Sequence, residues 1–165
     1  MPVVPIEFLD LLADDGWEPF VLDAQRDGAT WSEGGTLAEA PVDVAATFDG
    51  AVRRATRIDP TFGMTGVRLA PGARVPRHRH DRSLLLLVFG GAVTVEHEDE
   101  DGAVASAEVG TGRFCVIDED TPHALVAGLG GATLLASLPQ PAEGVATCWY
   151  PDEAWVPARA GRART

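Results

Sequence analysis

The chain has 165 residues and carries 25 acidic against 13 basic side chains, so its formal net charge is −12. Every basic residue is an arginine, and the absence of lysine excludes Schiff-base chemistry, which needs a lysine amine. The acidic balance argues against nucleic acid and anionic membranes as partners, because both attract a basic surface. Length and an apolar content of 45% predict one soluble globular domain.

The sequence shows no sign of a membrane or secreted protein. Its longest apolar run, residues 84–89, has the length of a strand, and the N-terminus lacks the basic residues of a secretory signal. Two cysteines, Cys115 and Cys148, are too few for a disulfide framework. We therefore expect a cytoplasmic protein whose cysteines are reduced.

The first predicted element is a short amphipathic helix over residues 5–14. Ile6, Leu9 and Leu12 recur at helical spacing, the segment begins at a proline, and Gly16 follows its end. Residues 17–49 show a weaker pattern, which is typical of edge strands and loops.

From residue 51 onward, short apolar runs alternate with turn residues. Eight strands are predicted, at residues 52–58, 63–69, 84–89, 92–97, 104–109, 113–117, 123–126 and 133–138. The glycines at 90–91 and 128–131 are interpreted as turns between separate strands. This pattern predicts an all-β sandwich or closed barrel over residues 1–157, followed by a disordered tail at 158–165.

Histidines are scarce, so few residues could form an imidazole site. His97 falls within the acidic stretch 96–101, which predicts a solvated hairpin tip. His78 and His80 are separated by one residue, so on an extended segment both side chains point to the same face. His123 is the remaining candidate for the third ligand of a metal ion.

Two blocks of sequence resemble the motifs of the cupin superfamily. In the first block, Gly72 is followed by five residues, His78-x-His80, three residues, Leu84, six residues and Gly91. In the second, Gly112 is followed by five residues and the segment 118–123, which ends in the metal-binding histidine of the motif. The resemblance covers about residues 50–140 and implies a jelly-roll barrel, the cupin double-stranded β-helix. The first block is also similar to small cupin dioxygenases of the dihydroxyacetophenone dioxygenase type, and to the cupin domain of zinc-binding anti-sigma factors.

The chain departs from the cupin motifs at two places. Leu84 stands where most cupins have a glutamate ligand, and Asp118 and Asp120 stand where proline and glycine are usual. The second departure concerns a turn. The first implies a metal held by three neutral imidazoles, unless Glu96 or Asp81 supplies a fourth ligand.

A site with three histidines leaves the full +2 charge on a divalent ion and so favours an anionic or chelating small molecule. The resemblance implies one metal ion, with Fe(II) favoured and Zn, Ni or Mn as alternatives. Arg68, Arg79 and Arg113 are candidate anchors for a substrate anion. Trp149, Tyr150 and Trp155, near the C-terminus, are expected to cap the barrel or a dimer interface. The resemblance also implies a homodimer.

Three functions stay open. The resemblance implies a mononuclear non-haem Fe(II) dioxygenase, an oxidoreductase acting on a small enolisable or phenolic ketone. The first alternative is a non-redox lyase, isomerase or cyclase that uses the metal as a Lewis acid. The second is a metal-binding sensor module without catalytic activity. A fourth interpretation opposes all three. In it, the chain is a cupin that has lost its activity and keeps its histidines for packing.

Overall fold

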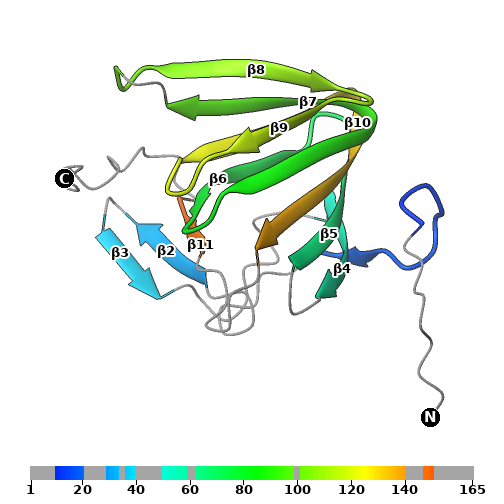
Figure 1. Cartoon of the computed structure of the whole chain (residues 1–165), viewed down its shortest axis with the longest axis horizontal. Helices are drawn as coiled ribbons and strands as arrows, with labels where there is room; N and C mark the ends of the chain where they lie inside the picture. The colour runs from blue at the N-terminus through cyan, green and yellow to red at the C-terminus, as the bar shows by residue number, and fades with distance from the viewer. Residues whose placement is uncertain are drawn as a thin grey trace, which may run out of the picture.

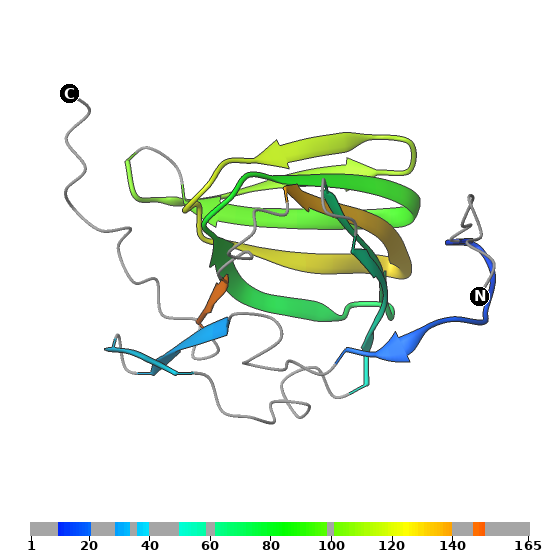
Figure 2. The same cartoon turned by 60° about the horizontal axis from the view of Figure 1, so that its bottom comes forward.

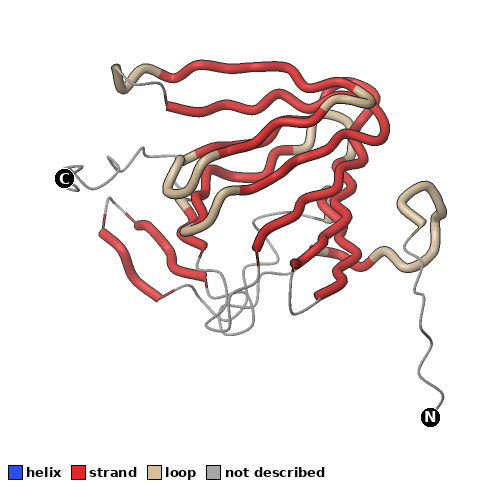
Figure 3. Tube along the Cα trace, in the orientation of Figure 1, coloured by secondary structure: helices blue, strands red, loops and turns tan. Residues whose placement is uncertain are grey.

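The computed structural model describes residues 10–20, 29–33, 36–39, 50–58, 62–98, 101–139 and 147–150. All regular elements among them are strands, as the trace in Figure 3 shows. The predicted all-β class is therefore confirmed. In chain order the strands are β1 (Glu18–Pro19), β2 (Ala29–Glu33), β3 (Thr36–Glu39), β4 (Val52–Ile58), β5 (Phe62–Leu69), β6 (Arg74–His80), β7 (Leu84–Glu98), β8 (Val104–Gly110), β9 (Phe114–Ile117), β10 (His123–Pro139) and β11 (Thr147–Trp149).

Two long strands, β7 and β10, hold the barrel together because each takes part in both of its sheets. The first sheet runs in the order β4, β5, β10, β7 and β9. The second runs in the order β8, β7, β10, β6, β11, β2 and β3. Neighbouring strands are antiparallel, except that β11 is parallel to β2. The sheets curl around a common interior, which gives the jelly-roll barrel that the motifs predict (Figures 1 and 2).

The prediction of turns at residues 90–91 and 128–131 is wrong, because β7 and β10 continue through both segments. The pairing between them shifts register between Ala127 and Ala132, where the two strands bend together. Gly91 has a φ of 71° and Gly131 a φ of 74°, a conformation that glycine adopts without a steric penalty. A β-carbon on Gly91 would overlap the carbonyl oxygen of Gly131. Glycine therefore marks the corner of the barrel here, and the strands do not end.

The N-terminal helix predicted for residues 5–14 is not seen. Residues 1–9 lie outside the described part of the chain, and residues 11–16 form bends. The carboxylate of Asp10 accepts hydrogen bonds from the backbone N–H groups of Leu12 and Ala13, at 2.9 and 3.2 Å. Such local side-chain bonds compete with helical ones. The segment instead places Leu11 and Trp17 on the outer face of the first sheet, against Gly66.

The interior of the barrel is filled by aliphatic side chains from both sheets. Leu86, Val88, Val93 and Leu134 are each no more than 1% exposed. Full burial of one such side chain stabilises the fold by roughly 1.5–3 kcal/mol. The interior is therefore a packed core, and only its edge is available for polar chemistry.

Part of the outer face of the first sheet is apolar and exposed. Leu85 and Phe89 on β7, and Phe114 and Val116 on β9, are 37–64% exposed. The predicted homodimer would bury this exposed apolar face, and the homodimer stays a prediction.

In the described part of the chain, no helix is long or apolar enough to cross a membrane, and the cytoplasmic location also stays a prediction. Both cysteines are free.

We expect the substitution Gly91→Ala to destabilise the barrel by about 2 kcal/mol or more, because it combines a positive φ with an overlap at the corner. Gly130→Ala is the matched control, since Gly130 lies in the same bend with open space around its α-carbon. Urea unfolding of the two variants measures the difference. Equal stabilities would show that the corner does not depend on Gly91.

Candidate metal centre

The site begins with one transverse row of residues across the second sheet. In the register of the strands, His97 on β7 pairs with His123 on β10, His123 pairs with His78 on β6, and His78 pairs with Trp149 on β11. Residues that are directly opposite each other in a sheet share a face. Strand pairing therefore brings together side chains that are far apart in the sequence.

An irregularity in β6 aims His78 at the interior. Between Val75 and His78 the strand advances three residues, while β10 advances two, from His123 to Leu125. This is the pattern of a β-bulge, and Pro76 suits it because proline has no N–H to donate to the ladder. Val75 belongs to the buried core, so the extra residue lets His78 face the same interior in spite of the odd spacing. His80 follows on that face two residues later.

His78, His80 and His123 form a compact cluster, as the spacing of the two motifs predicts. One imidazole nitrogen from each residue lies within 4.8 Å of the others. The ring centroid of His78 is 4.3 Å from that of His123 and 5.0 Å from that of His80. His78 and His123 are buried, with 5% and 1% of their surface exposed.

Hydrogen bonds at Nδ1 orient the three rings. Nδ1–H of His78 donates to the carbonyl oxygen of Pro76 at 2.8 Å, and Nδ1–H of His123 donates to that of Thr121 at 2.9 Å. Nδ1 of His80 bonds to the hydroxyl of Thr147 at 2.9 Å. A carbonyl can only accept, so His78 and His123 carry their proton on Nδ1 and leave the lone pair of Nε2 for another group.

Burial keeps the cluster neutral. It lowers the pKa of His78 well below the usual value, with further lowering by the imidazoles of His123 and His80. Burial and the neighbouring His123 lower the pKa of His80 to about 3. Burial also lowers the pKa of His123 to about 4, although the hydrogen bond to Thr121 raises it in part. Neutral imidazole is the form that binds metal ions.

The orphaned nitrogen of His123 is the clearest sign that a metal ion fits here. Its Nε2 is buried and has no hydrogen-bond partner in the described structure. A buried polar atom in that state costs about 1–3 kcal/mol, which a metal ion at the centre of the cluster would offset. Three neutral imidazoles with oriented rings suit a divalent transition metal, and imidazole alone does not select among Fe, Zn, Ni and Cu.

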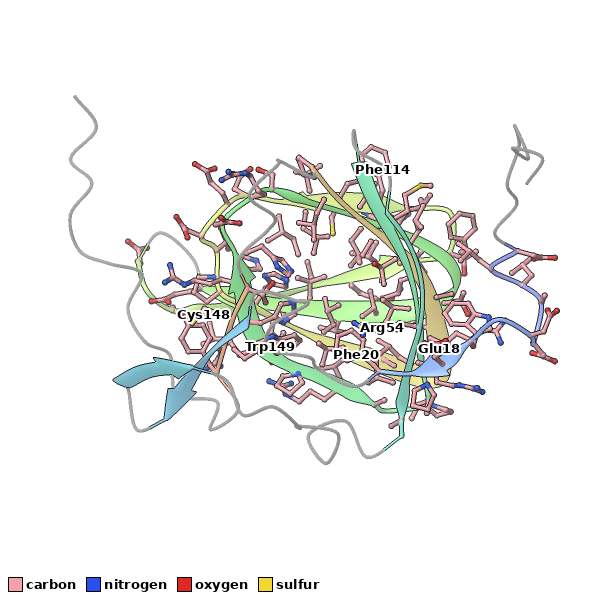
Figure 4. All side chains as sticks on the ribbon, turned by 90° about the horizontal axis from the view of Figure 1, so that it is seen from below. Glu18, Phe20, Arg54, Phe114, Cys148 and Trp149 are labelled. Atoms are coloured by element: carbon pink, nitrogen blue, oxygen red, sulfur yellow. The ribbon has the colours of Figure 1, made fainter. Side chains whose placement is uncertain are left out.

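Strand β11 supplies two supporting residues that the sequence did not reveal. Thr147 bonds to His80, and the ring of Trp149 stacks on that of His78, with centroids 4.5 Å apart and planes 24° apart. The ring centroids of Phe20 and Trp149 are 6.3 Å apart, and the guanidinium of Arg54 lies over the ring of Phe20 at 4.6 Å (Figure 4). The expectation that Trp149 caps the barrel or a dimer interface stays a prediction, and Trp149 is buried in the core, where it packs against His78. Only the pairing of β11 with β6 brings it there.

The unusual turn of the second motif fits the fold. Asp120 occupies the position where the motif has glycine, and its φ of 57° explains that preference. Aspartate tolerates this conformation better than most residues. Its backbone N–H donates to the carbonyl oxygen of His80 at 2.7 Å, and its carboxylate pairs with Arg79 at 3.1 Å. The turn is thereby fixed to the strand that carries two of the histidines.

No carboxylate joins the histidine cluster within the described part of the chain. Leu84 is 3% exposed and packs in the apolar core, so the usual glutamate position offers no ligand. The carboxylate of Glu96 bonds to Arg74 at 2.7 Å, which lowers its pKa, and Asp81 pairs with Arg82 at 3.7 Å. The suggestion of a fourth ligand from Glu96 or Asp81 is therefore not supported, and the ligand set is three imidazoles.

The three candidate arginines occupy different places. Arg79 lies on β6 between the two histidines, and its guanidinium bonds to Asp120. The structure does not bring Arg68 or Arg113 to the cluster. Arg68 lies over the ring of Trp17 and donates to the carbonyls of Leu11 and Ala13. Arg113 is exposed beside the corner, where its carbonyl accepts from Val88. Their role as substrate anchors stays a prediction.

Comparisons with known proteins returned structural similarities only. No protein-family model matches the chain, and no curated protein matches it. Among solved structures, oxalate decarboxylase from Bacillus subtilis at pH 4.6 is 24% identical, with a TM-score of 0.49 over 57% of this chain and 26% of that one. A single-residue variant of that enzyme is 26% identical, with a TM-score of 0.48 over 53% and 24% of the two chains. The chain thus spans about a quarter of the length of these proteins.

The curled jelly-roll barrel and its three-histidine cluster are the arrangement that the two sequence motifs predict, and together they form a candidate metal centre. Strand register assembles His78, His80 and His123, and their imidazoles are neutral and oriented. A divalent metal ion fits the cluster.

We expect Thr147→Val to weaken metal binding by about 10–100-fold, because it removes the hydroxyl that orients His80 while preserving shape. Thr147→Ser keeps the hydroxyl and is expected to retain most of the affinity. Competition titration with a chromophoric zinc chelator measures both values. Equal losses in the two variants would show that the hydroxyl has no orienting role.

The metal-free protein is expected to lose stability between about pH 7.5 and pH 5. Over this range the histidines of the unfolded chain gain protons near their ordinary pKa of 6.5, whereas those of the cluster, with pKa values near 3 and 4, do not. The unfolded state then binds more protons, so acidification favours unfolding. Urea unfolding at both pH values tests this, with the variant His80→Gln/His123→Gln as the control. A pH dependence that is identical in the control would contradict the assignment.

Proposed function

We propose that the chain is a mononuclear non-haem Fe(II) dioxygenase that acts on a small enolisable or phenolic ketone. The observation that carries the proposal is the carboxylate-free ligand set of His78, His80 and His123. Because none of these ligands is charged, a bound divalent ion keeps its full positive charge. That charge favours the enolate or phenolate form of a chelating ketone.

The residues of the chain hold the site in a state ready for an incoming ligand. The hydrogen bonds of Nδ1 to Pro76, Thr121 and Thr147 fix the rings, so little reorganisation is needed when a metal or ligand binds. A bound Fe(II) ion would supply the electrons that O₂ chemistry requires and a Lewis acid for the substrate oxygen atoms.

The walls of the site exclude water from one side. Below the row of His123 and His97 lies a row formed by Val95 and Leu125, each 5% exposed. Trp149 covers one face of His78. A dry and rigid inner wall strengthens the electrostatic attraction of an anionic ligand to the ion, because fewer water dipoles oppose it.

Two other functions compete with this proposal on the same observation. A full +2 charge serves equally in a non-redox lyase, isomerase or cyclase that polarises a carbonyl group with Zn or Ni. A sensor module would use the site for binding alone. Dependence on O₂ separates the three, since only the dioxygenase consumes it.

We expect protein loaded with Fe(II) under anaerobic conditions to consume O₂ when an enolisable diketone such as 2,4-pentanedione is added. Cleavage by a dioxygenase uses one O₂ per diketone and places its two oxygen atoms in the products, a carboxylic acid and a ketoaldehyde. An oxygen electrode and product analysis measure this stoichiometry, and His123→Ala is the inactive control. Turnover of candidate ketones by the zinc-loaded protein without O₂ would support the lyase group instead. No iron retention and no O₂ uptake would refute the proposal.

A further inference from the structure

His97 occupies a different environment from the one its acidic neighbours in the sequence predict. The sequence places it in a solvated hairpin tip. In the structure it lies on β7 directly opposite His123, with Ala105 of β8 on its other side. Val93 and Val95 precede it at alternate positions and are buried in the core. Its side chain therefore belongs to the interior face of the second sheet.

The interior face changes from apolar to polar at the row formed by His97 and His123. The paired residues Val93 and Ala127, and then Val95 and Leu125, are all buried and apolar. The next pair along the strands is His97 with His123. His97 is partly exposed, while His123 is only 1% exposed. The fourth histidine of the chain thus stands at the rim of the barrel interior, beside a metal ligand.

His97 is adjacent to the cluster but is not part of it. The group whose nitrogens lie within 4.8 Å of one another contains three histidines and excludes His97. Burial is the main cause of the lowered pKa of His123, and the nearby His97 lowers it further. In the register of the sheet His97 therefore lies next to the cluster without belonging to it.

The hydrogen bond at Nδ1 determines which nitrogen of His97 donates and which one accepts. Its Nδ1 lies 3.3 Å from the carbonyl oxygen of Glu98, and a carbonyl only accepts, so Nδ1 carries the proton. Nε2 then has a lone pair and is an acceptor. Within the described residues, no hydrogen bond to this Nε2 is present. The residue opposite His97 on β8 is Ala105, which has a small side chain, and His97 itself is partly exposed.

We propose that His97 is a specificity-determining residue that accepts a hydrogen bond at Nε2 from a hydroxyl group of the metal-bound ligand. The site would then prefer chelators that keep an O–H group, such as hydroxy acids and hydroxyketones, over those that lack one. The inference rests on the metal centre and not on the proposed oxidation, so it can be tested without O₂ or turnover. It assigns a function to the one histidine that the two motifs leave unused.

The test compares two ligands that differ in whether the oxygen atom next to the carboxylate-bearing carbon carries a hydrogen or a methyl group. Protein loaded with Co²⁺ is titrated anaerobically with glycolate or with methoxyacetate, in which a methyl group replaces the hydroxyl hydrogen. The visible absorption of the metal reports binding. We expect wild-type protein to bind glycolate more tightly, and His97→Ala to weaken glycolate by about fivefold to tenfold while leaving methoxyacetate unchanged. His97→Gln, whose side-chain carbonyl can accept, is expected to restore part of the preference.

Controls separate this role from metal ligation and from a surface role. The Co²⁺ affinity of His97→Ala should equal that of wild type, and Ser106→Ala on the exposed face of β8 should behave as wild type throughout. A loss of metal affinity in His97→Ala would make His97 a ligand and overturn the proposal. Wild-type protein that shows no preference for glycolate, or a preference that survives His97→Ala, would also overturn it. Protein that binds no Co²⁺ would refute the metal centre itself, which is a different failure from an absence of O₂ uptake.

Discussion

The pairing of β10 with β6, and the extra residue that interrupts it, is the constraint on which the metal centre depends. In a strand, a shift by one residue moves a side chain to the opposite face. Without the bulge between Val75 and His78, core packing at Val75 and metal binding at His78 would require opposite faces of β6. The bulge turns both side chains to the same face of β6, so that the strand contributes Val75 to the core at its start and two imidazoles at its end.

The surroundings of the three histidines favour binding of an ion or ligand at the expense of the folding stability of the barrel. Imidazoles in the barrel lose hydration, and Nε2 of His123 has no partner to compensate for that loss. A packed apolar cluster in the same place would contribute more to folding. The chain instead devotes two backbone carbonyls, one hydroxyl and a stacked indole to orienting rings whose coordinating atoms remain available. A divalent ion at the centre of the cluster would give these coordinating atoms the partner that they lack.

Local patterns predicted the strands well and the connections poorly. Four of the expected strands match β4, β5, β8 and β9 closely, because alternating apolar residues report burial of one face, whereas β6 was not among the eight predicted strands. The glycines at the corner were misinterpreted, because a glycine with positive φ serves a turn and a bent strand alike. The predicted helix is not seen in its described part, residues 10–14, because helical spacing reports amphipathic character but not the competing hydrogen bonds of Asp10.

The sequence by itself determined the ligand set, because the spacing of His78 and His80 on a strand and the position of His123 in a second motif leave few alternatives. It also determined the absence of a glutamate at position 84. Only the tertiary structure decided what surrounds those ligands. Strand register places Trp149 and Thr147 behind the histidines and His97 beside them, and register between distant strands follows from the packing of the whole barrel, which no local pattern contains. The net charge of −12 therefore describes the chain as a whole, while the candidate metal centre consists of three neutral imidazoles, of which those of His78 and His123 are buried.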